Sequence, residues 1–322
     1  MAPRVAAGSV GVAARDVRHL PRRPRATVAL GGGGARGYAH IGVLEVLEER
    51  GYEIVGIAGC SMGALVGGLY AAGDLAAYSE WVRGLTHRDV LRLFDLSPRA
   101  PGAIRAEKIF ARVNDILGDV RIEDLPVRFT AVATDLMTGE ERWFREGPVT
   151  AAIRASVALP GFITPVVLGG RLLADGGLTN PLPLAATTNG ADLTVAVAVA
   201  GRRRPAAAPV VRSRAGARAE DVFEALPAGL RMREVMGLSL EAARTAVIRS
   251  TLATHPPDVL VTVPRSACRT LDFHKAGEMT GLGRRLAVEA LDRYEDDCSL
   301  PGRRSGGGGH GRPERDELLA PS

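Results

Sequence analysis

The chain has few cysteines and no long apolar run. Three of its 322 residues are cysteines, namely Cys60, Cys268 and Cys298. Their odd number and wide spacing predict reduced thiols and argue against both a disulfide framework and a zinc knuckle. The longest apolar runs, 64–73 and 193–201, fall well short of the roughly 20 residues that span a bilayer. We therefore expect no transmembrane helix and no bound metal.

The first 25 residues contain no continuous apolar stretch, so they do not resemble a secretory signal, and a cytoplasmic location is expected. They carry six arginines and one acidic residue, which accounts for the whole formal charge of +5. Aromatic residues make up only 4% of the chain, and no known nucleic-acid-binding motif accompanies the arginines. We therefore expect no nucleic-acid partner.

A second group of arginines lies in the Pro/Ala/Arg-rich stretch 201–219, which has no acidic residue before Glu220. This stretch predicts a solvated, flexible excursion of one domain. Contact with anionic lipid head groups at a membrane surface is the alternative.

The rest of the chain predicts one folded domain at 26–297, flanked by a disordered basic tail at 1–25 and a disordered tail at 298–322. A short apolar run at 27–30 ends in four glycines and is followed by apolar residues at three-residue spacing. The same order recurs at 54–72. Two successive strand-loop-helix units predict a parallel sheet within an α/β fold.

Further strands are expected at 127–133, 166–168, 171–174, 194–199 and 259–263. Further helices are expected near 75–94, 105–117, 148–157, 228–252 and 275–293.

The sequence Gly-Cys-Ser-Met-Gly at 59–63 fits G-x-S-x-G and lies between a predicted strand and a predicted helix. Such an elbow forces the serine into a strained turn, with Gly59 and Gly63 avoiding steric clashes. The helix N-terminus favours negative charge near the serine. The motif therefore indicates Ser61 as a nucleophile.

The glycine-rich stretch 31–37 admits several interpretations. A dinucleotide fingerprint would need an acidic residue at the end of the second strand, and a P-loop would need a closing Lys-Ser/Thr pair; both are absent. A structural glycine turn is the simplest alternative, although four consecutive glycines exceed what a turn usually needs. The remaining interpretation is an oxyanion hole, in which successive backbone N–H groups of this loop converge on a carbonyl oxygen.

Asp175 follows a short apolar strand and precedes Gly176 and Gly177. Asp-Gly is also a common turn pair, so from these residues alone a turn aspartate is an equal alternative to a functional one.

Taken together, the glycine loop, the G-x-S-x-G motif about 25 residues later and the Asp-Gly-Gly motif more than 100 residues further on resemble the patatin-like phospholipases. The resemblance is strongest to bacterial members related to the catalytic domain of neuropathy target esterase, and it covers roughly 26–295. The stretches 133–135, 155–162 and 180–183 also resemble segments of that family.

The resemblance implies a three-layer α/β/α fold with a mainly parallel central sheet. It also implies a serine acyl-hydrolase of the phospholipase or lysophospholipase type, which acts on lipid esters without metal or cofactor. When the family's residue roles are transferred to the matching positions, the resemblance implies that Ser61 is the nucleophile and Asp175 its base. It also implies that Gly32, Gly33 and Gly34 supply the oxyanion donors. Arg36, followed by Gly37, matches a basic position of the family's glycine loop, where it positions the loop or meets a substrate phosphate.

Two alternatives remain. A conventional α/β-hydrolase would use a Ser-Asp-His triad in chain order, and His255 and His274 both follow Asp175. His40 is nearer the glycine loop but is expected to cap or pack. A catalytically silent lipid-binding protein of the same fold is the other alternative. Head group, acyl-chain preference and oligomeric state depend on shape that these patterns do not encode.

Overall fold

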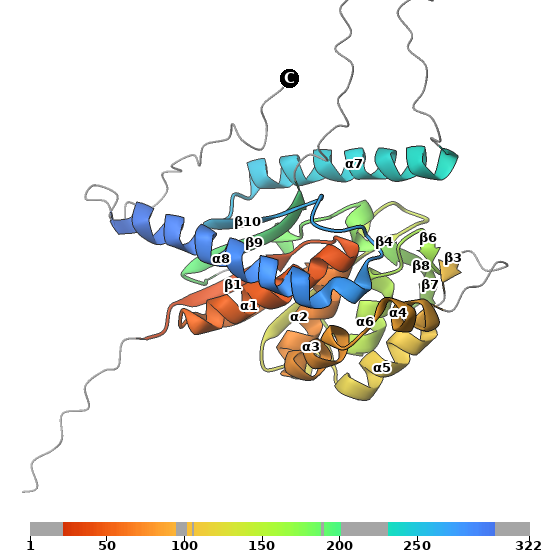
Figure 1. The fold of residues 1–322 in the computed structure, drawn as a ribbon, viewed down its shortest axis with the longest axis horizontal. Helices are drawn as coiled ribbons and strands as arrows, with labels where there is room; N and C mark the ends of the chain where they lie inside the picture. Colours follow the sequence, from red (N-terminus) through yellow and green to blue (C-terminus); the bar gives the residue numbers. More distant parts are fainter. Residues whose placement is uncertain (1–21, 95–101, 105, 188–189, 201–230, 300–322) are drawn as a thin grey trace, which may run out of the picture.

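A computed structural model describes residues 22–94, 102–104, 106–187, 190–200 and 231–299 (Figure 1). The predicted excursion at 201–219 lies outside the described residues. Of the two predicted tails, only residues 22–25 and 298–299 are described.

The core of the molecule is a sheet with the strand order β10-β9-β1-β2-β4-β8-β7, and β5 pairs with β4 off this path. The strands β10, β9, β1, β2 and β4 pair in parallel, whereas β5, β7 and β8 pair antiparallel at one side. The mainly parallel sheet predicted from the two strand-loop-helix units is therefore confirmed. The strands are β1 (Arg25–Leu30), β2 (Glu53–Cys60), β4 (Arg128–Asp135), β5 (Glu141–Phe144), β7 (Val166–Leu168), β8 (Arg171–Asp175), β9 (Leu193–Ala200) and β10 (Val259–Pro264). A separate pair joins β3 (Gly102–Ile104) to β6 (Gly161–Ile163).

Helices cover both faces of this sheet, as Figure 1 shows. Strand β9 explains why, because its side chains alternate between two apolar clusters. Val195, Val197 and Val199 face the cluster that contains α1, α2 and α8, whereas Ala196 and Ala198 pack with Ile248 and Leu252 of α7. A strand with apolar residues on both faces must be covered on both sides, which produces the three-layer α/β/α arrangement. The longer helices are α1 (Ala39–Glu49), α2 (Met62–Ala72), α3 (Leu75–Arg83), α4 (His87–Leu93), α5 (Glu107–Leu117), α6 (Val149–Ser156), α7 (Met232–Thr254) and α8 (Ala276–Ser299).

Two predicted helix boundaries differ from the structure. The helix expected near 75–94 is two helices, because the Thr86 side chain accepts a hydrogen bond from the Asp89 N–H and starts α4 afresh. Helix α8 continues to Ser299, past the expected end of the domain at 297. No proline interrupts the helix within residues 276–299. The short strands β3, β5 and β6 were missed, since three or four residues show little periodicity.

Among the described helices, none is both long enough and apolar enough to cross a bilayer.

Candidate active site

Three chain segments meet at one edge of the sheet because of its register. Leu30 of β1 pairs with Gly59 of β2, so the glycine loop after β1 and the turn after β2 leave the sheet side by side. Cys60 pairs with Val132 of β4, and the next residue of β4, Ala133, pairs with Asp175 on its other side. The turn that carries Ser61 and the end of β8 are thus brought together. This edge, at the carboxyl ends of parallel strands, is where α/β folds bind ligands.

Ser61 occupies a strained turn between β2 and α2. Its backbone has φ 54° and ψ −126°. Residues other than glycine rarely adopt such a positive φ. Its N–H donates to Ser156 Oγ at 2.9 Å, and the Ser156 hydroxyl in turn donates to the Val132 carbonyl at 2.6 Å. Fully buried Ser156 therefore pins the elbow to strand β4. The sequence predicted the elbow but gave Ser156 no role, although it lies within the stretch 155–162.

The predicted supporting glycines allow close backbone approach around this elbow. A Cβ at Gly63 would overlap the Leu30 carbonyl, one at Gly59 would overlap the Gly63 backbone, and one at Gly37 would overlap the Met62 side chain. Beyond Asp175, a Cβ at Gly176 would overlap the Val132 carbonyl. The absence of side chains lets α2 and the glycine loop pack directly against the strands.

Replacing Gly63 with alanine is expected to destabilise the fold, because the Leu30 carbonyl it would strike belongs to the backbone of a buried strand. Overpacking of this kind costs roughly 1–3 kcal/mol, and a backbone clash lies at the upper end. Urea unfolding measures the loss. Gly277→Ala in α8 is the matched control, because its Cβ would meet open space. An unchanged urea midpoint for Gly63→Ala would contradict the packing described here.

Asp175 ends β8 and is fully buried. Its Oδ1 accepts a hydrogen bond from the Gly177 N–H at 2.7 Å, whereas its buried Oδ2 has no hydrogen-bond partner. Burial raises the pKa of the carboxyl above its usual value; Arg244, the Ser61 hydroxyl and the Gly177 N–H oppose this in part. Ser61 and Asp175 are close enough to interact but do not form a hydrogen bond of normal geometry here. A buried carboxylate with one unoccupied oxygen beside a hydroxyl is suited to accept its proton.

The glycine loop offers only some of the predicted N–H donors. The Gly32 N–H already donates to the Pro181 carbonyl at 3.1 Å. No described residue accepts a hydrogen bond from the N–H groups of Gly33, Gly34 or Met62, the residue after Ser61. All three residues line the same cavity as Ser61.

Arg36 and His40 hold this loop in place. Arg36 donates to the Gly33 carbonyl at 3.2 Å, to the Thr270 hydroxyl at 2.7 Å and to the Arg265 carbonyl at 3.4 Å. His40 is fully buried, and burial lowers its pKa to about 4, so the imidazole is neutral. Its Nε2–H donates to the Gly31 carbonyl at 2.8 Å. Of the two roles expected for Arg36, these contacts favour positioning the loop.

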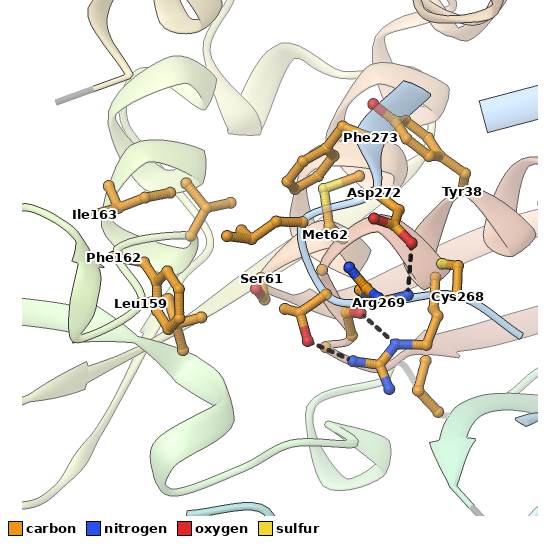
Figure 2. A pocket seen from close by; sticks show the side chains of 18 of the residues that line it. Tyr38, Ser61, Met62, Leu159, Phe162, Ile163, Cys268, Arg269, Asp272 and Phe273 are labelled. Carbon is orange, nitrogen blue, oxygen red and sulfur yellow. Dashed lines mark hydrogen bonds between the residues drawn. The ribbon is translucent and has the colours of Figure 1, made fainter. Parts of the chain in front are cut away.

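A cavity of about 1140 Å³ opens beside Ser61. Figure 2 shows Ser61 between Leu159, Phe162 and Ile163 on one side and the segment from Cys268 to Phe273 on the other. Much of the lining is apolar, as an acyl chain requires.

Comparison with known proteins agrees with this geometry. The model of the patatin-like phospholipase family matches residues 28–188. An uncharacterized NTE family protein of Mycobacterium tuberculosis is 45% identical, over 85% of this chain and 93% of its own length. The chain belongs to the patatin-like phospholipase family. Membership indicates a lipid-ester hydrolase, and it confirms the resemblance seen in the three motifs.

More distant relatives match only part of the chain. A patatin-like phospholipase domain-containing protein of Caenorhabditis elegans is 36% identical, over 48% of this chain and 12% of its own. Neuropathy target esterase of Drosophila grimshawi is 34% identical, over 48% of this chain and 11% of its own. Among solved structures, VipD from Legionella pneumophila is similar at 14% identity and a TM-score of 0.49, covering 85% of this chain and 67% of its own.

In this patatin-like chain, no described histidine forms a hydrogen bond with Ser61 or Asp175. His255 is exposed and contacts the Thr254 hydroxyl, and His274 stacks edge-on with His87 at 5.0 Å between ring centroids. His40 binds the glycine loop instead. Neither His255 nor His274 lines the cavity beside Ser61. The described residues also contain no group of three side chains suited to hold a metal ion.

One charged residue that the sequence analysis did not single out lies at the site. Arg244 of α7 lines the cavity and acts electrostatically on Asp175. It comes from a helix on the opposite face of the sheet from α2, and no local motif marks it. Only the packing of α7 brings it there.

Proposed function

We propose that this chain hydrolyses fatty-acyl esters of phospholipids or lysophospholipids, with Ser61 as nucleophile and Asp175 as general base. The observation that carries the proposal is the buried Asp175 carboxylate, which has one oxygen without a hydrogen-bond partner and interacts with the hydroxyl of a serine in a strained elbow. Family membership and an apolar cavity of acyl-chain dimensions support the substrate class.

In this mechanism Asp175 takes the proton as Ser61 Oγ attacks the ester carbonyl carbon. The carbonyl oxygen becomes an oxyanion, which the N–H groups of Gly33, Gly34 and Met62 stabilise together with the N-terminus of α2. The intermediate collapses, the C–O bond to the alcohol breaks, and Asp175 returns the proton to the leaving oxygen. Asp175 then takes a proton from a water molecule as the water oxygen attacks the acyl carbonyl carbon. The bond from that carbon to Ser61 Oγ breaks, Asp175 returns the proton to Oγ, and the fatty acid leaves.

Exposed apolar residues at the cavity rim support an origin of the substrate in a lipid surface. Phe162, Leu238 and Leu271 line the cavity and are 39%, 49% and 37% exposed. Such side chains lose contact with water when the rim meets a bilayer or micelle. Peripheral membrane contact is thus part of the proposal, and the cytoplasmic location stays a prediction.

Labelling with a fluorophosphonate tests the nucleophile and the oxyanion site together. Ser61 Oγ would attack phosphorus, fluoride would leave, and the phosphoryl oxygen would occupy the oxyanion site. Mass mapping of digested protein is expected to find one adduct, on the peptide that contains Ser61, and none in Ser61→Ala. An adduct on another residue, or active protein that stays unlabelled, would contradict the assignment.

A further inference from the structure

Four arginines line the cavity, namely Arg36, Arg244, Arg265 and Arg269. Arg269 is exposed, and Arg36 and Arg265 are already engaged. Arg36 gives its hydrogen bonds to the glycine loop and the 265–270 segment, as described above. Arg265 forms an ion pair with Glu241 and donates to the Thr245 hydroxyl at 2.8 Å. Both therefore hold protein segments together.

The Arg244 guanidinium lies against the catalytic loops. Its Nη2 is 2.7 Å from the point where a Cβ at Gly32 would sit, and Ser61 Cβ is 3.2 Å from the same point. Nη2 is also 3.1 Å from the corresponding point at Gly177. The guanidinium thus lies between Gly32 of the glycine loop and Gly177 in the turn after Asp175. Only a small chemical group would fit between it and Ser61.

Arg244 has no partner of its own among the described residues. It appears in no hydrogen bond or ion pair there, and its Nε is buried without an acceptor. Glu241 pairs with Arg265 instead, and Asp175 interacts with Arg244 electrostatically but forms no ion pair with it. Arg244 is half-buried, and its buried Nε–H without an acceptor is costly; an anion bound in the cavity would offset that cost.

We propose that Arg244 binds an anionic group of the substrate, a phosphate or carboxylate close to the scissile ester, and so selects anionic over neutral esters. This inference rests on the proposed function. A guanidinium presents several N–H donors in a plane that matches two oxygens of such a group. Arg36 and Arg265 are tied to protein segments, and Arg269 is exposed. The Arg244 guanidinium, in contrast, lies against Gly32 and Gly177, so we assign the recognition to Arg244.

Binding of decyl phosphate, compared with decanol, tests the inference without any turnover. In calorimetric titrations, Arg244→Gln is expected to weaken decyl phosphate binding roughly 10- to 100-fold, the usual range for a hydrogen-bonded charged group. Decanol binding is expected to change less than threefold. Arg244→Lys keeps the charge and is expected to retain part of the affinity. The matched control is Arg249→Gln, an exposed arginine on the same helix, which should bind like wild type.

Kinetics with one acyl chain on two head groups gives the second measurement. For Arg244→Gln we expect kcat/KM to fall at least tenfold with oleoyl lysophosphatidate and less than threefold with monooleoylglycerol. Added inorganic phosphate is expected to inhibit the wild-type reaction with monooleoylglycerol and to inhibit Arg244→Gln less.

Equal losses on both substrates, or unchanged decyl phosphate affinity in folded Arg244→Gln, would overturn the anion site. Phosphate inhibition that depends on Arg244, without any preference for lysophosphatidate, would show a site for free anions and overturn substrate recognition. The binding titrations do not depend on Ser61 chemistry. A failure of the proposed function would instead appear as an active Ser61→Ala variant.

Discussion

Ser61→Ala is expected to lower ester hydrolysis on the order of 10⁴-fold or more while leaving the protein folded. The residual rate would come from the oxyanion donors and substrate binding alone. The hydroxyl makes no structural hydrogen bond, because the contact that pins the elbow uses the Ser61 backbone N–H. Alanine keeps that bond and creates little cavity, so the thermal midpoint should stay close to that of wild type.

Turnover of a short-chain nitrophenyl ester and thermal melting would be measured side by side. Ser79→Ala is the matched control, since Ser79 is also a buried serine, and its hydroxyl has no partner. It should retain full activity. A Ser61→Ala protein with activity within tenfold of wild type would exclude Ser61 as the nucleophile.

Asp175→Asn is expected to remove nearly all turnover, roughly 10³- to 10⁴-fold, because an amide cannot accept the serine proton. No described histidine is placed to replace it. His255→Ala and His274→Ala should therefore each keep activity within about threefold of wild type. A folded histidine variant as inactive as Ser61→Ala would favour the Ser-Asp-His triad instead.

The pH profile of wild type provides an independent measurement on the same residue. Burial raises the pKa of Asp175, and the groups facing it are Arg244, Ser61, the Gly177 N–H and the thiol of Cys60. Burial also raises the pKa of that thiol, so Cys60 stays uncharged at neutral pH. Activity requires the ionised carboxylate. It should therefore fall as the pH drops through the raised pKa of Asp175, and this acidic limb should be absent from the residual rate of Asp175→Asn.

The same pKa shift has a consequence for stability. A carboxyl whose pKa is higher in the folded than in the unfolded state favours folding when protonated and opposes it when ionised. At neutral pH the buried, ionised Asp175 therefore destabilises the native state. Asp175→Asn removes that cost, so the inactive variant should melt at or above the wild-type temperature at pH 7. A lower midpoint would show that the carboxylate stabilises the fold.

Helices and strands that are long, or that adjoin a motif, could be predicted from residues close together in the sequence. Runs such as 27–30 and 54–58 are apolar because their strands are covered on both faces, and the glycines after each run marked the loops at which Ser61 and Gly33 lie. The predicted strand 166–168 coincides with β7. The break between α3 and α4 at Thr86 was missed. The apolar spacing there fits one continuous helix, the Thr86–Asp89 capping box fits a new helix, and the sequence pattern does not show which of the two forms.

The sequence by itself determined the fold class, the family and the identity of Ser61 and Asp175 as candidates, because each is marked by residues close together in the chain. Only the tertiary structure decided how these residues are used. Asp175 and Ser61 are more than 100 residues apart in the chain and meet through the register of β2, β4 and β8. The Gly32 N–H is occupied by the Pro181 carbonyl, and Arg244 reaches the site from α7. Long-range pairing and packing create these contacts, and neither leaves a local pattern in the sequence.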